Sequence, residues 1–217
     1  MPCNCSSDTG LHDHMGDGFM RDGAFGIGVP LNSSIDLTTI QLWNAKHTPT
    51  EARRVFSPDT VENTEPISSD DDPELLVNLS LSNFCRIKGI SILGPVDGYA
   101  PSQVKIFVNL PEMRGFDSVR RLIPQEEIHL AQLSADDRVV YRLNATKFAN
   151  VSSLSLFFEN SFNNDETQLL RVDIFGESSG RPTTQQVATN VVYEGRANPA
   201  DHATEEERRL FASGGVV

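Results

Sequence analysis

Apolar residues alternate with polar or smaller ones in several stretches of this chain, and a period of two is the pattern of β-strands with one buried face. In residues 75–81 the apolar positions are Leu75, Val77, Leu79 and Leu81. A similar alternation returns in three later stretches, 104–108, 151–158 and 170–176. We therefore expect these four stretches to be strands.

The apolar face changes sides within residues 85–92. Cys85 and Ile87 occupy odd-numbered positions, whereas Ile90 is even-numbered. A slip of one residue with Gly at the junction is typical of a β-bulge, so we predict one at Lys88-Gly89. Turn signals separate this stretch from the strand that follows, and the simplest arrangement of the first three strands is an antiparallel meander.

The segments before these strands contain the first candidate binding surface. Residues 35–43 form an apolar opening segment, in which Trp43 is expected to anchor the core. A polar connection, 44–73, follows, and long ordered loops in compact domains are often functional. It includes the residues that we take as candidates for partner binding: Arg53, Arg54 and Phe56.

The pattern as a whole predicts an all-β fold, a β-sandwich or a jelly roll, because short strands dominate and few helices are indicated. Residues 128–133 are equally consistent with a strand and with one helical turn. We expect one domain over residues 30–197 and a disordered, glycine-rich segment over 1–29. Residues 198–217 form a tail that is either a short helix folding on docking or a frayed end.

The charge narrows the choice of partners. A formal net charge of −12 argues against nucleic acid, whose binding depends on Lys and Arg that neutralise phosphates, and against anionic membranes. The sequence shows no apolar stretch long enough to span a membrane and no signal-peptide pattern at its start. We therefore expect a soluble, intracellular monomer.

Two groups of side chains are candidates for metal binding. The first group, Cys3, Cys5, His12 and His14, contains ligands that zinc prefers, but the C-x-C spacing is not that of structural zinc sites. These four residues are therefore only weak metal candidates.

The second group is the acidic run Asp70, Asp71 and Asp72. Clustered carboxylates can bind Ca²⁺, cap a turn and the following strand, or face a basic partner surface. The five histidines are accompanied by no nucleophile motif, phosphate loop or metal-spaced partner. We therefore expect neither an enzymatic activity nor a cofactor.

Several separated motifs resemble, in the same order, the PITH domain, the proteasome-interacting module at the C-terminus of a thioredoxin-like protein. The motifs are 69–76, 87–92, 104–109, 148–160 and 174–176. The resemblance implies a jelly roll of the galactose-binding-like class, similar to the Doc domain of the anaphase-promoting complex. It also implies association with the regulatory particle of the 26S proteasome, in the cytoplasm and the nucleus.

The tail resembles that of free-standing members of the family, and it adds four candidates for partner binding, Asn198, Pro199, Asp201 and His202. The thioredoxin domain of other members is absent from this sequence, so their dithiol chemistry is not carried over. Two functions follow as alternatives. One is a non-enzymatic adaptor of the ubiquitin–proteasome system, and the other is a jelly roll that binds a small molecule or glycan.

Overall fold

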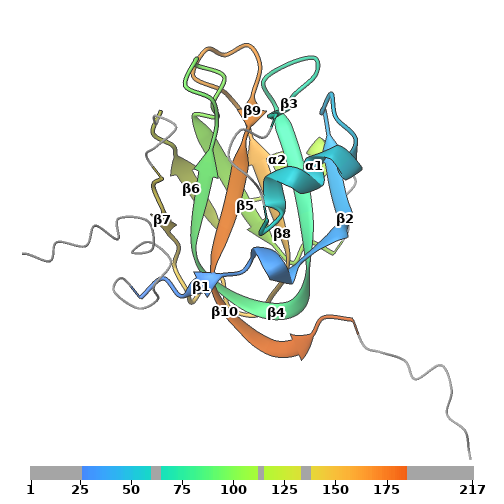
Figure 1. Ribbon diagram of the computed structural model, residues 1–217, viewed down its shortest axis with the longest axis vertical. Helices are drawn as coiled ribbons and strands as arrows, with labels where there is room; N and C mark the ends of the chain where they lie inside the picture. Colours follow the sequence, from blue (N-terminus) through green and yellow to red (C-terminus); the bar gives the residue numbers. More distant parts are fainter. Residues whose placement is uncertain (1–25, 60–64, 112–114, 133–137, 185–217) are drawn as a thin grey trace, which may run out of the picture. The chain divides into compact units, whose positions relative to one another are not determined.

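One strand of 19 residues, β4 (Leu75–Leu93), belongs to both layers of a β-sandwich. The computed structural model describes residues 26–59, 65–111, 115–132 and 138–184. β4 pairs in its first half with β2 (Ile35–Trp43) and β8 (Val151–Phe158), and in its second half mainly with β10 (Arg171–Pro182) and β7 (Tyr141–Arg142). Figure 1 shows β4 curving round the lower end of the molecule from one layer to the other.

Three further strands complete the two layers. β5 (Gln103–Val108) pairs with β8, β6 (Glu126–His129) pairs with β5, and β1 (Val29–Pro30) pairs with β10. The first layer thus runs β2-β4-β8-β5-β6 and the second β1-β10-β4-β7, with every pair antiparallel. β3 (Ile67–Ser68) and β9 (Gln168–Leu169) form a separate small sheet. This architecture confirms the predicted jelly-roll β-sandwich.

The predicted bulge lies where β4 pairs with β10. Phe175 is opposite Gly89, but the next residue, Gly176, is opposite Ile87, so that Lys88 is the extra residue. The backbones approach closely here, because a Cβ atom on Gly176 would lie 2.0 Å from the Arg86 carbonyl oxygen. Glycine is therefore required at this point of β10.

The predicted meander is wrong in two respects. Residues 75–81 and 85–92 are one continuous strand, because the chain between them contains no turn and stays extended while it curls. The strand at 104–108 does not pair with β4, since residues 94–102 carry the chain across to the first layer, where β5 lies beside β8. Of residues 128–133, Ile128 and His129 belong to strand β6 and 130–132 to no helix, while Leu133 lies outside the described residues.

The long polar connection contains a helix, α1 (Pro49–Phe56). It begins with a capping box, in which the Thr48 side chain accepts a hydrogen bond from the Glu51 backbone N–H and the Glu51 carboxylate accepts one from the Thr48 backbone N–H. Ala52, Val55 and Phe56 on the helix are fully buried. A short 3-10 helix, η1 (Asn32–Ser34), precedes β2.

Apolar side chains form two clusters. The larger one fills the space between the layers and includes Leu79, Ile90, Leu156 and Ile174. The smaller one lies on the outer face of the first layer, where a second helix, α2 (Phe116–Arg120), covers Leu76, Phe107 and Phe157. Trp43, predicted to anchor the core, is only half-buried and packs against this smaller cluster. None of the helices in the described ranges is long and apolar enough to cross a membrane.

Candidate functional site

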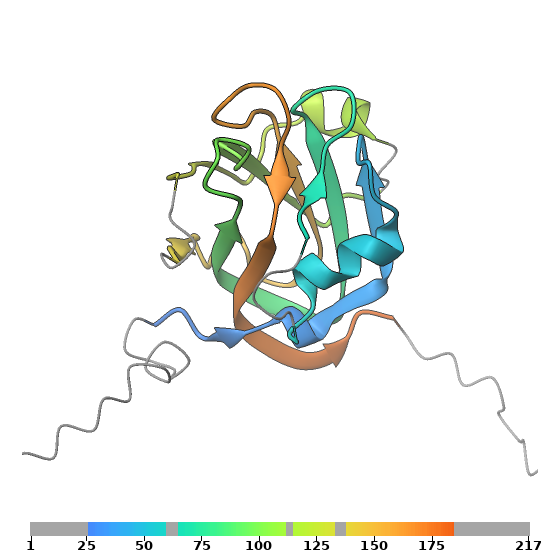
Figure 2. The same ribbon diagram turned by 45° about the horizontal axis from the view of Figure 1, so that its top comes forward.

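Three loops meet at one end of the sandwich, at the top of Figures 1 and 2: residues 69–74, 94–102 and 160–168. Backbone hydrogen bonds join them. The Phe162 N–H donates to the Ala100 carbonyl oxygen at 3.1 Å, and the Ser69 N–H donates to the Thr167 carbonyl oxygen at 2.9 Å. A direct backbone connection of this kind fixes the loops relative to one another.

Asn44, at the end of β2, holds the acidic loop in shape. Its backbone is left-handed, with φ of 57°, a region that Asn tolerates better than most residues. Its amide Nδ2 donates to Asp72 Oδ1 at 2.7 Å and to the Glu74 carbonyl oxygen at 2.6 Å, and its Oδ1 accepts from the Asp71 N–H at 3.2 Å. Asp72 therefore acts as the cap of the turn, while the side chains of Asp70 and Asp71 face solvent.

An ion pair adds to the rigidity of this end. Lys46 Nζ lies 2.6 Å from Glu166 Oε2, and Gln168 Nε2 donates to the other carboxylate oxygen at 2.8 Å. Burial alone would raise the pKa of Glu166, but the hydrogen bonds from Lys46, Gln168 and Ser68 outweigh it and lower the pKa to about 2. Glu166 is therefore charged over the whole physiological pH range.

Two large apolar side chains are exposed on the same loops. Val96 is 56% exposed and Phe162 is 37% exposed, and each has an exposed carboxylate one or three residues away, Asp97 or Asp165. We use the name loop-end surface for the following residues: Asp70, Asp71, Val96, Asp97, Phe162 and Asp165. Across the described ranges, no group of three or more His, Cys, Asp or Glu side chains is arranged to hold a metal ion. The loop-end surface is thus held in one conformation and presents exposed carboxylates together with two exposed apolar side chains.

The other predicted partner-binding residues lie elsewhere. Arg53 Nε donates to the Leu37 carbonyl oxygen at 2.8 Å and Arg54 Nε to the Glu65 carbonyl oxygen at 2.8 Å, so both arginines attach α1 to neighbouring segments. Phe56 lies in the core with 0% of its surface exposed. The remaining candidates fall outside the described residues; they are Asn198, Pro199, Asp201 and His202, and the weak metal candidates Cys3, Cys5, His12 and His14.

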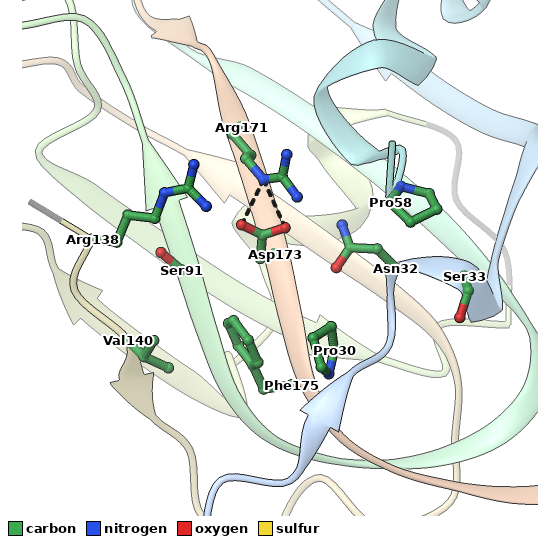
Figure 3. A pocket seen from close by; sticks show the side chains of 10 residues that line it. All are labelled: Pro30, Asn32, Ser33, Pro58, Ser91, Arg138, Val140, Arg171, Asp173 and Phe175. Atoms are coloured by element: carbon green, nitrogen blue, oxygen red, sulfur yellow. Dashed lines mark hydrogen bonds and ion pairs between the residues drawn. The ribbon is translucent and has the colours of Figure 1, made fainter. Parts of the chain in front are cut away.

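A cleft of about 390 Å³ lies on the outer face of the second layer (Figure 3). Arg171, Asp173 and Phe175 project into it from β10, and Ser91 projects from β4 beside Asp173. The sides are formed by segments on either side of these strands, with Arg138 and Val140 on one side and Pro30, Asn32, Ser33 and Pro58 on the other.

The polar side chains at the floor of the cleft are hydrogen-bonded. Arg171 Nε donates to both carboxylate oxygens of Asp173, at 2.9 and 2.8 Å, and Asp173 is only 7% exposed. Asn32 is 2% exposed and donates to the carbonyl oxygens of Phe56 at 3.0 Å and Val172 at 2.8 Å. We did not predict this site, although the alternation along 170–176 places polar side chains on the face opposite the core.

Comparison with known proteins shows the family. A family model described as the PITH domain matches residues 23–197. PITH domain-containing protein CG6153 of Drosophila melanogaster is 32% identical over 204 residues, which are 93% of this chain and 94% of that protein. PITH domain-containing protein 1 of Homo sapiens is 30% identical over 179 residues, 82% of each chain.

A solved structure shows the same fold in a distant protein. Part of CpGH89 from Clostridium perfringens matches 86% of this chain and 18% of its own, with a TM-score of 0.51 and 15% identity. An F5/8 type C domain from Bacteroides fragilis matches 67% of this chain and 97% of its own, with a TM-score of 0.46 and 11% identity. At 15% identity, the likeness to CpGH89 shows a shared fold and carries no information on ligands.

Proposed function

Because the chain belongs to the PITH domain family, we propose that it is a non-enzymatic protein-binding module that associates with the regulatory particle of the 26S proteasome. It acts there as an adaptor or regulator of the ubiquitin–proteasome system, in the cytoplasm and the nucleus. The observation that most supports binding is the loop-end surface, where hydrogen-bonded loops present exposed carboxylates next to Val96 and Phe162.

The chemistry of this surface favours a partner with basic side chains around an apolar depression. Phe162 and Val96 would supply the buried contacts, which carry most of the binding energy in protein interfaces. Asp70, Asp71 and Asp165 would contact the basic rim, where charges mainly set association rate and specificity. Since the loops are already fixed to one another, little conformational entropy is lost on binding.

The non-enzymatic part of the proposal concerns the two histidines in the described ranges. His47 Nδ1 accepts a hydrogen bond from the Ser68 backbone N–H at 3.2 Å, a contact that joins the start of the long connection to β3. His129 is exposed on β6. General-base catalysis requires a histidine next to the group that it deprotonates, and within the described part of the chain neither imidazole is hydrogen-bonded to a Ser, Thr or Cys side chain.

The test is binding of the full-length protein to purified 26S regulatory particle. Phe162→Ser is expected to weaken binding about tenfold or more, and Asp71→Lys is expected to slow association and to reduce its dependence on salt. The matched controls are Val139→Ser, at another exposed apolar residue, and Asp59→Lys, with the same change of charge elsewhere. Equal binding by all four variants would contradict the assignment to the loop-end surface.

The cleft over β10 favours a second candidate function, the binding of a small molecule or glycan. Phe175 offers an aromatic surface, and the paired side chains of Arg171 and Asp173 offer hydrogen-bonding groups at the floor. Ligand-observed NMR with a library of small molecules and saccharides tests it. A ligand whose signal is lost with Phe175→Ala, and kept with Phe162→Ser, would support the cleft as a binding site. If the library contains no ligand with this behaviour, the result contradicts a ligand-binding function of the cleft.

A further inference from the structure

The segment that follows α2 exposes three consecutive side chains, one basic and two aliphatic. Ile123 is 91% exposed, Leu122 is 46% exposed and Arg121 also faces solvent. Single exposed aliphatic residues are common, but an almost fully exposed Ile next to a half-exposed Leu forms a small contiguous apolar patch, the kind of surface that can contact another protein. We refer to residues 121–123 as the Arg-Leu-Ile tip.

Both sides of the tip are attached to the sandwich. Before it, Val119 is buried against Phe107 and Phe157, and the Leu122 backbone N–H donates to the Val119 carbonyl oxygen at 3.1 Å. After it, the Gln125 N–H donates to the Ile106 carbonyl oxygen at 2.9 Å. The tip is therefore presented in one position, which lowers the entropic cost of inserting it into a partner.

The charge at the tip is opposite to that of the whole chain. The formal net charge is −12, whereas Arg121 lies in the tip and Arg120 directly precedes it. Arg120 forms an ion pair with Glu74 and lies over the Phe116 ring, 5.2 Å from its centroid. Arg121 has no hydrogen bond or ion pair to any side chain that the structure describes. A cation next to exposed aliphatic side chains favours a partner with an apolar pocket and carboxylates at its edge.

Other occupants fit less well. An anionic membrane would have to approach a protein of large negative charge. In a second copy of this chain, the only carboxylate among the described residues that line the cleft over β10 is Asp173, which is 7% exposed and already paired with Arg171, so the cleft offers little to Arg121.

We propose that the Arg-Leu-Ile tip is a second protein-contact site, which inserts Leu122 and Ile123 into an apolar pocket of a partner protein, with Arg121 against carboxylates at the pocket edge. The tip belongs to the segment that covers the outer face of the first layer, so the proposal does not depend on the function of the loop-end surface.

Photo-crosslinking of the full-length chain in cells tests the proposal. Benzoylphenylalanine replaces Ile123, and in the matched control it replaces Val139, another exposed aliphatic residue at 38% exposure. Mass spectrometry then locates the adducts on the partner. We expect adducts from position 123 at one site of one protein, among apolar residues flanked by Asp or Glu. When Arg121→Glu is combined with the crosslinker at position 123, the yield of adducts should fall about tenfold. Arg121→Lys should retain most of the yield.

Three results would overturn the proposal. The first is a yield at position 123 no higher than at position 139, and the second is a set of adducts confined to another copy of this chain or to lipid. The third is a yield that Arg121→Glu leaves unchanged. Because the crosslinker replaces an almost fully exposed side chain, the fold itself should be unaffected, and an unchanged thermal midpoint of each variant verifies this.

Discussion

The two outer faces of the sandwich differ in what covers them. On the first layer, Leu76, Phe107 and Phe157 are covered by α2 and are almost fully buried. On the second layer, the outward side chains of β10 include the ion pair of Arg171 and Asp173, and the face remains open as a cleft. The part of the first face beneath α2 is thus stabilised by apolar packing, whereas polar side chains that hydrogen-bond to one another and to the backbone form the floor of the cleft on the second.

Among substitutions that test this comparison, we expect Phe107→Ala to lower the free energy of unfolding most. The side chain is 1% exposed beneath α2, and its truncation should lower the free energy of unfolding by about 3–5 kcal/mol. Urea unfolding followed by fluorescence measures it. Phe162→Ala, at a half-exposed Phe, is the control and should cost far less; similar losses for both would show that α2 does not seal this face.

A smaller effect is expected from Asn32→Ala on the polar face. The change leaves the Phe56 and Val172 carbonyl oxygens and the Ile174 N–H without their partner, which should cost about 2 kcal/mol. The same unfolding measurement applies, with Ser33→Ala at the exposed neighbouring position as the control. A loss below that of Ser33→Ala would contradict the view that hydrogen bonds hold this face together.

The smallest effect is expected at the loop end, from Glu166→Gln. This change removes the partly exposed ion pair with Lys46 and should cost at most about 1 kcal/mol near neutral pH. The folded-state pKa of Glu166 is about 2, below its ordinary value of 4.5. The stabilisation should therefore be complete above pH 4.5 and be lost as the pH falls towards 2.

Unfolding curves of the wild type and Glu166→Gln at several pH values check this dependence. The difference between the two proteins should shrink as the solution becomes more acidic. Glu65→Gln, at an exposed glutamate, provides the control. A difference that grows at low pH would mean that Glu166 does not stabilise the loop end as a charged group.

The sequence predicted the fold class and the bulge because both depend on alternation that is visible locally. The change of face at Lys88-Gly89 is visible in the order of apolar residues, and the structure places the extra residue there. The continuity of β4 across both layers was missed, since curling is set by contacts with β8 and β10, far away in the chain. Phe107 and Phe157, which interrupt the alternation, were the local sign of a second apolar face.

The candidate site was predicted only in part. The acidic run was singled out, and the structure shows Asp72 as a cap and Asp70 and Asp71 as exposed. The contribution of Val96 and Phe162 depends on hydrogen bonds between loops more than 60 residues apart in sequence, which no local pattern indicates. Arg53 and Arg54 looked available for a partner because nothing in the sequence shows that they bind carbonyl oxygens of Leu37 and Glu65, outside α1.

The most direct test of the proposed function is affinity purification of the tagged full-length protein from cells that express it, at low and at moderate salt, with mass spectrometry of the proteins that co-purify. We expect regulatory-particle subunits of the 26S proteasome in near-stoichiometric amounts, reduced at the higher salt because acidic groups contribute to the contact. Recovery of none of these subunits at either salt concentration would contradict the proposed association, while the jelly-roll fold and the family would still hold.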